Sequence, residues 1–155
     1  MAKNYNKMFM DIALLTAEQS NCVKYKVGCV VVLNDRVVLQ GYNGTPKGFI
    51  NCDEKFPDGV VGWNDKLKHS EWSKAFEVHA EMNVITYAAK NGISLDGTTI
   101  YVTHYPCNNC LKHLVSSGVK SIVYLNDYRD NNKQYDIKEM VRLINIRKYE
   151  EHTNS

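Results

Sequence analysis

Two short segments carry residue types that bind a transition metal and move protons. They read His-Ala-Glu at residues 79–81 and Pro-Cys-Asn-Asn-Cys at residues 106–110. A catalytic zinc takes three nitrogen or sulfur ligands and keeps a fourth position for water. His79, Cys107 and Cys110 would fill the three positions. Because zinc lowers the pKa of bound water from about 15.7 toward about 7, this set predicts hydrolysis in which Glu81 transfers protons.

A structural zinc site is the alternative for the same residues. Such a site is normally closed by a fourth Cys or His, and the sequence holds no further Cys-x-x-Cys and no close pair of histidines. Pro106 by itself would only mark the start of a helix. The order H-x-E and then P-C-x-x-C resembles the signature of the zinc deaminases, in which Glu is a proton carrier and not a ligand. We therefore favour a catalytic site.

Helices and strands must hold both segments at one end of a sheet. His79 lies near the start of a helix expected over residues 77–90, which ends at Asn91-Gly92, and Cys107 stands at the start of the next, over residues 108–117. A strand, a helix and a strand with short links predict parallel pairing, which brings both helix starts to one end. We expect one three-layer α/β/α domain over residues 1–155, with a central mixed sheet of about five strands.

The remaining elements follow from periodicity and turn residues. They are a helix over residues 5–20, a hairpin of two buried strands over 27–33 and 36–42, strands over 98–103 and 121–125, a helix over 137–143 capped by Asp136, and a short edge strand at 144–146. Residues 41–70 are rich in Gly, Pro, Asn and Asp without a sustained period. We expect a long irregular segment there, of a kind often retained for binding, which needs an anchor.

Composition limits the classes of partner. The 155 residues include 19 Lys and Arg and 17 Asp and Glu, a net charge of +2, which favours a small anionic ligand over a polynucleotide. Neither a membrane span nor a signal peptide is indicated, so we expect a soluble cytoplasmic protein. The five cysteines are expected to be reduced, and Cys29, within a strand, is expected in the core.

Further motifs narrow the chemistry. They are Ser20-Asn21-Cys22, Lys26-Val27-Gly28, GYNGTP at residues 41–46, Asn51-Cys52, HSEWS at residues 69–73 and Tyr101-Val102-Thr103. With them the chain resembles the deoxycytidylate (dCMP) deaminases, and among these the phage-encoded enzymes of the T-even type. The resemblance implies a cytidine deaminase-like fold and zinc-dependent hydrolysis of dCMP to dUMP and ammonia, in the host cytoplasm for a phage-encoded protein.

The same resemblance implies regulation and assembly. The dUMP would supply thymidylate synthesis, dCTP would activate and dTTP would inhibit at a separate site, and the chain would form a homo-hexamer. Mg²⁺ is a candidate companion of the regulatory nucleoside triphosphate. The implied effector residues are Gly41, Tyr42, Asn43, Gly44, Tyr87 and Lys90. Without the resemblance, Tyr87 and Lys90 would be one packed and one exposed position of a helix.

Three residues are candidates for substrate binding. The resemblance places Asn43 near a ribose hydroxyl and Tyr128 on the face of the base. Lys26 is our candidate for the 5′-phosphate, because a dianion needs a cation. The plainer interpretations are an Asn in a left-handed turn, a tyrosine of the surface or core, and a solvated lysine.

The resemblance also implies a second, structural zinc. Its candidate ligands are Cys22, Cys52, His69 and Glu77. A structural zinc site has four protein ligands and no open position. These four ligands would anchor the irregular segment over residues 41–70. The alternative is a pair of buried thiols with a surface histidine.

Two rival functions remain open at this point. One is the same chemistry on free cytidine, a guanine-type base, or an adenine or cytosine in nucleic acid. The other is a zinc scaffold without activity, which would not require the carboxylate of Glu81 beside the ligands.

Overall fold

The computed structural model describes residues 3–128 and 138–151. Its elements are α1 (Tyr5–Ala17), β1 (Gly28–Leu33), β2 (Arg36–Tyr42), α2 (Cys52–Lys55), α3 (Gly62–Phe76), α4 (Ala80–Asn91), β3 (Thr99–His104), α5 (Asn108–Ser116), β4 (Ser121–Asn126), α6 (Lys138–Val141) and β5 (Asn145–Lys148). Within these ranges no helix is long and apolar enough to cross a bilayer.

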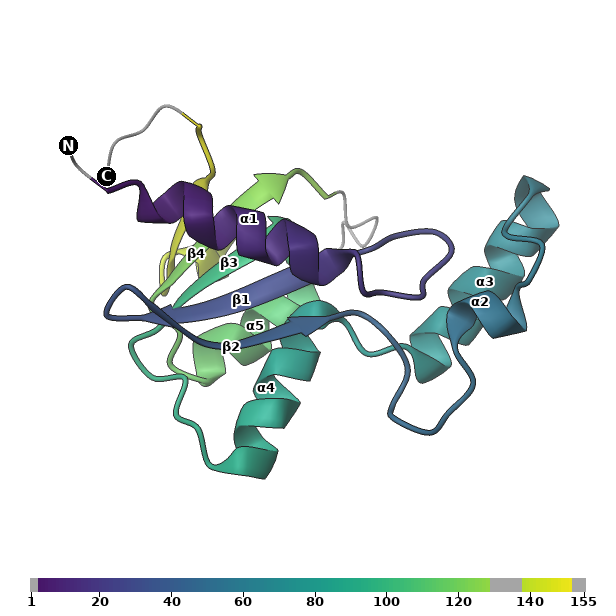
Figure 1. Cartoon of the computed structure of the whole chain (residues 1–155), viewed down its shortest axis with the longest axis horizontal. Helices are drawn as coiled ribbons and strands as arrows, with labels where there is room; N and C mark the ends of the chain where they lie inside the picture. The colour runs from purple at the N-terminus through teal and green to yellow at the C-terminus, as the bar shows by residue number, and fades with distance from the viewer. Residues whose placement is uncertain (1–2, 129–137, 152–155) are drawn as a thin grey trace.

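The strands form one five-stranded mixed sheet in the order β2-β1-β3-β4-β5. β1 is antiparallel to β2 and β3, whereas β3, β4 and β5 run parallel. Helix α1 lies on one side of the sheet, and α4 and α5 lie on the other (Figure 1). The expected α/β fold with a central mixed sheet of about five strands is confirmed, including the short edge strand β5.

Each face of the sheet has its own apolar core. Phe9 and Met10 of α1 pack on one face, while Val84 of α4 and Leu111 of α5 are fully buried on the other, together with Cys29 as expected. Gly28 lets α1 approach β1 closely, because a Cβ there would lie 2.0 Å from the carbonyl oxygen of Ala13. Because helices pack on both faces of the sheet, the strand ends next to the site are held in place.

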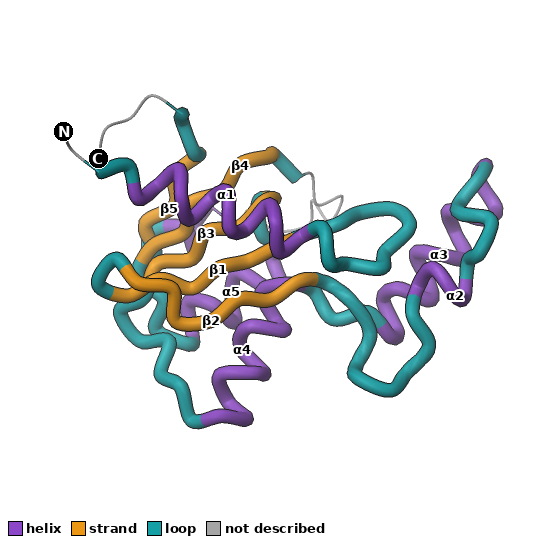
Figure 2. The backbone as a smooth tube through the Cα atoms, in the orientation of Figure 1, coloured by secondary structure: helices purple, strands orange, loops and turns teal. Residues whose placement is uncertain are grey.

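The expectation of an irregular segment over residues 41–70 was wrong. This stretch contains α2 and the start of α3, which extend away from the sheet together (Figure 2). Phe56 packs against Trp72 at 5.6 Å and against His69 at 5.3 Å between ring centroids. Within α3 only His69 is buried, so the helix lacks the apolar stripe by which a sequence reveals a helix.

Three further expectations differ from the structure. β2 is mostly exposed, with only Leu39 buried, because it is the edge strand of the sheet. Helix α1 ends at Ala17 and not at residue 20. Helix α4 begins at Ala80 and not at residue 77, because Val78 pairs with Gly44 in an isolated β-bridge. Asp136, the expected cap of the last helix, lies outside the described residues.

Candidate active site

The N-termini of α4 and α5 bring His79, Cys107 and Cys110 together. His79 is the N-cap residue of α4 and has an extended backbone, with φ −64° and ψ 154°. Cys107 is the N-cap residue of α5, and its sulfur accepts a hydrogen bond from the backbone N–H of Cys110 at 3.4 Å. Both helix starts therefore direct the positive ends of their dipoles toward one point.

The separations of the three side chains fit one zinc ion. Nδ1 of His79 lies 3.5 Å from Sγ of Cys107 and 3.4 Å from Sγ of Cys110. In a tetrahedral site with zinc–sulfur bonds of about 2.3 Å and zinc–nitrogen bonds of about 2.0–2.1 Å, the two ligand atoms lie roughly 3.6 Å apart. His79 is exposed and Cys110 is buried, so the cluster is open on one side. A catalytic zinc site has this arrangement, with three protein ligands and one open side for water.

The electrostatics of the pair favour a thiolate at Cys107. Its hydrogen bond with Cys110, the hydrogen bond with His79 and the backbone N–H of Cys110 lower the pKa of Cys107 from 9.0 to about 4. The hydrogen bond with Cys107 and burial raise the pKa of Cys110. Thiolate is the form that ligates zinc. One of the two sulfurs is therefore ready to bind before the metal arrives, and metal binding must displace the proton of the other.

Glu81 lies in the first turn of α4, one residue inside the helix from its N-terminal alanine. Its side chain is buried, with 4% of its surface exposed, yet it lines the same cavity as His79 and Cys107. Burial raises the pKa of Glu81, because desolvation disfavours the charged form. A carboxyl placed beside a metal-ligand set can take up and release a proton during the reaction.

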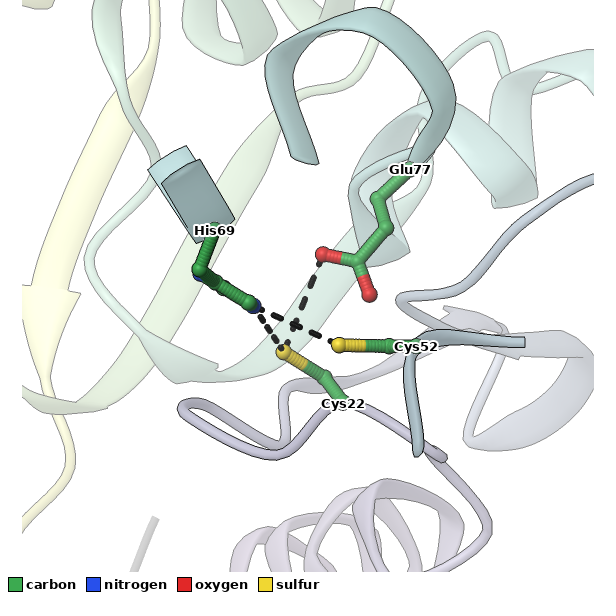
Figure 3. Close-up of side chains that lie close together, drawn as sticks. All are labelled: Cys22, Cys52, His69 and Glu77. Atoms are coloured by element: carbon green, nitrogen blue, oxygen red, sulfur yellow. Dashed lines mark hydrogen bonds between the residues drawn. The ribbon is translucent and has the colours of Figure 1, made fainter. Parts of the chain in front are cut away.

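A second cluster joins four side chains from distant parts of the chain. Cys22 precedes β1, Cys52 begins α2, His69 lies in α3 and Glu77 follows α3, and all four point toward one centre (Figure 3). Nε2 of His69 lies 3.3 Å from Sγ of Cys52 and 3.7 Å from Sγ of Cys22. Sγ of Cys22 lies 3.7 Å from Oε2 of Glu77. The structure thus brings together all four candidate ligands of the second zinc.

The chemistry of this second cluster fits a closed metal site. Its three Cys and His side chains are each at most 5% exposed, and burial lowers the pKa of His69, which keeps the imidazole neutral and able to ligate. Ser73 donates a hydrogen bond to Oε2 of Glu77 at 2.6 Å. The other oxygen, Oε1, is buried and has no hydrogen-bond partner within the described ranges. An unpaired buried carboxylate oxygen is costly unless a cation occupies the cluster.

A cavity of about 330 Å³ opens beside the first cluster. Asn43 and Tyr128 line it, as expected for substrate-binding residues, whereas Lys26 is exposed and is not among the lining residues. Lys24 and Lys74 are the lysines of the lining. Lys26 stays a prediction for the 5′-phosphate. Residues 18–27 form no helix or strand, so no periodicity in the sequence indicates which lysine faces the cavity.

Sequence reasoning also missed other lining residues, among them Tyr25, His104 and Ser70. Tyr25 neighbours Lys24 in the irregular segment, and Lys24 Nζ lies 5.4 Å from the centroid of its ring. His104 ends β3 and contacts Tyr25 edge-on, with ring centroids 6.5 Å apart; burial lowers the pKa of His104. Ser70 of α3 also lines the cavity. Of these residues, only His104 could have been found from the sequence, because it lies at the end of a strand just before the Pro-Cys segment.

An open depression lies on the other side of the 43–44 segment. It is lined by all six residues expected to bind an effector: Gly41, Tyr42, Asn43, Gly44, Tyr87 and Lys90. Helix α4 packs closely against Gly41. A Cβ at this position would lie 3.1 Å from Cγ2 of Val84 and 3.2 Å from the carbonyl oxygen of Ala80. A Cβ at Gly44 would have nothing within 4 Å, so this residue leaves backbone open to the depression.

The amino-acid sequence matches the profile of one protein family. The profile described as "Cytidine and deoxycytidylate deaminase zinc-binding region" covers residues 3–126, which include both segments of the first cluster. The chain belongs to this family. Membership confirms the resemblance drawn from the sequence motifs.

Individual members of the deaminase family are similar over most of the chain. The deoxycytidylate deaminase of Enterobacteria phage T2 is 35% identical and the match covers 82% of each chain. The corresponding enzyme of phage T4 is 36% identical, covering 82% of this chain and 80% of that protein. The dCMP deaminase of cyanophage S-TIM5, solved in complex with dCMP and dUMP, is 34% identical with a TM-score of 0.75, covering 96% of this chain and 99% of that one.

Proposed function

We propose that this deaminase hydrolyses dCMP to dUMP and ammonia, with zinc held by His79, Cys107 and Cys110. The observation that carries the proposal is the pairing of this ligand set, at 3.4–3.5 Å, with the buried carboxyl of Glu81 on one cavity. The relatives from phages T2 and T4 each match 82% of this chain, and their names give deoxycytidylate as the substrate. When bound, zinc polarises water for attack on C4 of the base.

The chain's own residues then move protons and hold the substrate. Glu81 takes a proton from the attacking water and delivers it to N3 of the base. It takes the second water proton and gives it to the departing amine, so that dCMP and water become dUMP and ammonia. Tyr128 stacks on the pyrimidine. The burial of Glu81 keeps bulk water from competing for these protons.

A substrate panel tests this function. Ammonia release from dCMP, deoxycytidine, dCTP and single-stranded DNA is compared at equal concentrations with the zinc-loaded protein. We expect dCMP to be turned over fastest. Faster release from deoxycytidine or from DNA would assign the cavity to another substrate of the same chemistry.

We propose that Lys24, which lines the cavity, binds the 5′-phosphate. Lys26, the candidate from the sequence, is the alternative. Replacing Lys24 by Ala should lower kcat/KM for dCMP by about 10- to 100-fold, the value of one charged hydrogen bond. Deoxycytidine, which has no phosphate, should be unaffected. Lys26→Ala is the matched control and should change neither substrate. The reverse pattern, with loss only in Lys26→Ala, would return the phosphate to Lys26.

We also propose an effector site, which the family resemblance implies and which is supported by six residues that line one depression. dCTP, with Mg²⁺ as its companion, binds the depression and raises the rate at low dCMP, whereas dTTP lowers it. Initial rates with each triphosphate test this. A response to neither would remove the regulatory proposal. The homo-hexamer and the supply of dUMP to thymidylate synthesis also stay predictions.

A further inference from the structure

Asn43 separates the two hollows of the molecule. It follows the last residue of β2 and lines both the catalytic cavity and the open depression. Only 8% of its surface is exposed. Its neighbour Gly44 pairs with Val78, the residue before the metal ligand His79. Asn43 therefore stands in a shared wall between the two sites.

The side chain of Asn43 is bound to the backbone of one short segment. Its Nδ2 donates to the carbonyl oxygen of Tyr25 at 2.8 Å, and its Oδ1 accepts from the N–H of Val27 at 2.9 Å. Its backbone N–H donates to the carbonyl oxygen of Val27 at 3.2 Å, and its own carbonyl oxygen accepts from Oγ of Ser20 at 2.9 Å. Four hydrogen bonds thus tie this single residue to residues 20–27.

Side chains other than Asn43 also bind the backbone of this segment: the N–H groups of Val23 and Tyr25 donate to Sγ of Cys52 and of Cys22, each at 3.5 Å, and the N–H of Cys22 donates to Oγ of Ser20 at 3.2 Å. Residues 18–27 form no helix or strand, so their backbone groups need partners from elsewhere. The Asn43 amide supplies partners for Tyr25 and Val27, next to the place where Lys24 and Tyr25 line the catalytic cavity. Loss of the amide would free this part of the wall while leaving the metal ligands untouched.

We propose that Asn43 is a positioning residue that holds the Lys24–Tyr25 wall in place for the phosphate end of the substrate. The inference rests on the proposed function, because it needs dCMP as the substrate. It differs from a direct contact between Asn43 and the ribose hydroxyl. Both amide atoms already make one hydrogen bond to the backbone, although each retains capacity for another, so experiment must separate the two roles.

Asn43→Ala tests the proposal on three substrates. We expect kcat/KM for dCMP to fall about tenfold, through KM, with kcat nearly unchanged. The value for 2′,3′-dideoxy-CMP should fall by the same factor, because it retains the phosphate. The value for deoxycytidine should change by less than about twofold. In a Lys24→Ala background, Asn43→Ala should have no further effect on dCMP, because it acts through that lysine.

Asn6→Ala is the matched control. Asn6 is also a buried asparagine, 4% exposed, but it lies in α1 on the other face of the sheet and accepts from Arg147 at 3.3 Å. Its loss should lower stability without changing the ratio of kcat/KM between dCMP and deoxycytidine. If Asn43→Ala does not fold, Asn43→Ser, which leaves a small polar group in the wall, is measured on the same three substrates.

Several results would overturn the inference. They are an unchanged kcat/KM, a loss in kcat alone, an equal loss for dCMP and deoxycytidine, or a loss that vanishes for the dideoxy substrate, which would show that Asn43 contacts the sugar hydroxyl. Wild-type protein that fails to turn over dCMP would remove the proposed function and this inference with it. Active wild-type protein with an unselective Asn43 variant would remove the inference alone.

Discussion

Replacing Glu81 by Gln should lower kcat for dCMP by about 10²- to 10⁴-fold, the range supplied by a general acid–base group. Gln has nearly the same shape and can fill the same buried space, but it cannot accept and return a proton. The measurement is the steady-state rate of dUMP formation, with zinc per chain and the melting temperature determined on the same preparation.

The control for Glu81→Gln is the metal itself. Because Glu81 is not one of the three ligands, the variant should bind as much zinc as the wild type and melt at a similar temperature. A variant that loses zinc or unfolds would give Glu81 a structural role. Unchanged turnover would remove Glu81 from the mechanism.

Replacing Cys52 by Ala should reduce the metal content from two zinc ions per chain to one and lower stability. A ligand present at a thousand times its dissociation constant stabilises a fold by about 4 kcal/mol, and loss of the second metal removes a contribution of this size. Burial raises the pKa of Cys52 to about 12, so without a cation this side chain is a neutral thiol whose contacts with His69 at 3.3 Å and with the backbone N–H of Val23 at 3.5 Å are weak hydrogen bonds. Metal analysis and thermal unfolding measure both effects.

Cys29 supplies the matched control for the second metal. Its thiol is fully buried in β1 and belongs to neither cluster, so Cys29→Ala should keep both zinc ions and cost only about 1 kcal/mol. Wild-type protein with one zinc, or a Cys52→Ala variant that keeps two, would contradict the expectation that Cys22, Cys52, His69 and Glu77 hold a second zinc. The catalytic metal should remain in Cys52→Ala, because its ligands belong to the other cluster.

The first metal cluster could be predicted from sequence because its ligands are locally ordered. His79 and Cys107 are the N-cap residues of two helices, and both helices were expected from the sequence, although α4 begins three residues later than expected. The buried strands β1 and β3 were also predictable, since their runs of apolar residues have no other stable place. The reasoning failed where an element lacks an apolar face: α3 buries only His69, and a polar helix looks like a loop.

The walls of the cavity could be predicted only in part. Tyr128 and Asn43 were found through family resemblance, but the choice between Lys24 and Lys26 depends on the path of an irregular segment. That path is fixed by Asn43, which lies 16 residues further along the chain from Val27. Long-range hydrogen bonds of this kind leave no periodic pattern in the sequence, so they emerge only from the folded chain.

Dependence of dCMP turnover on zinc tests the central claim most directly. Metal-depleted protein is titrated with zinc, and dUMP and ammonia are measured against zinc bound per chain. We expect no turnover without metal, and equal amounts of dUMP and ammonia once the cluster of His79, Cys107 and Cys110 is filled. Full turnover by the metal-free protein, or none by the zinc-loaded protein, would contradict this account.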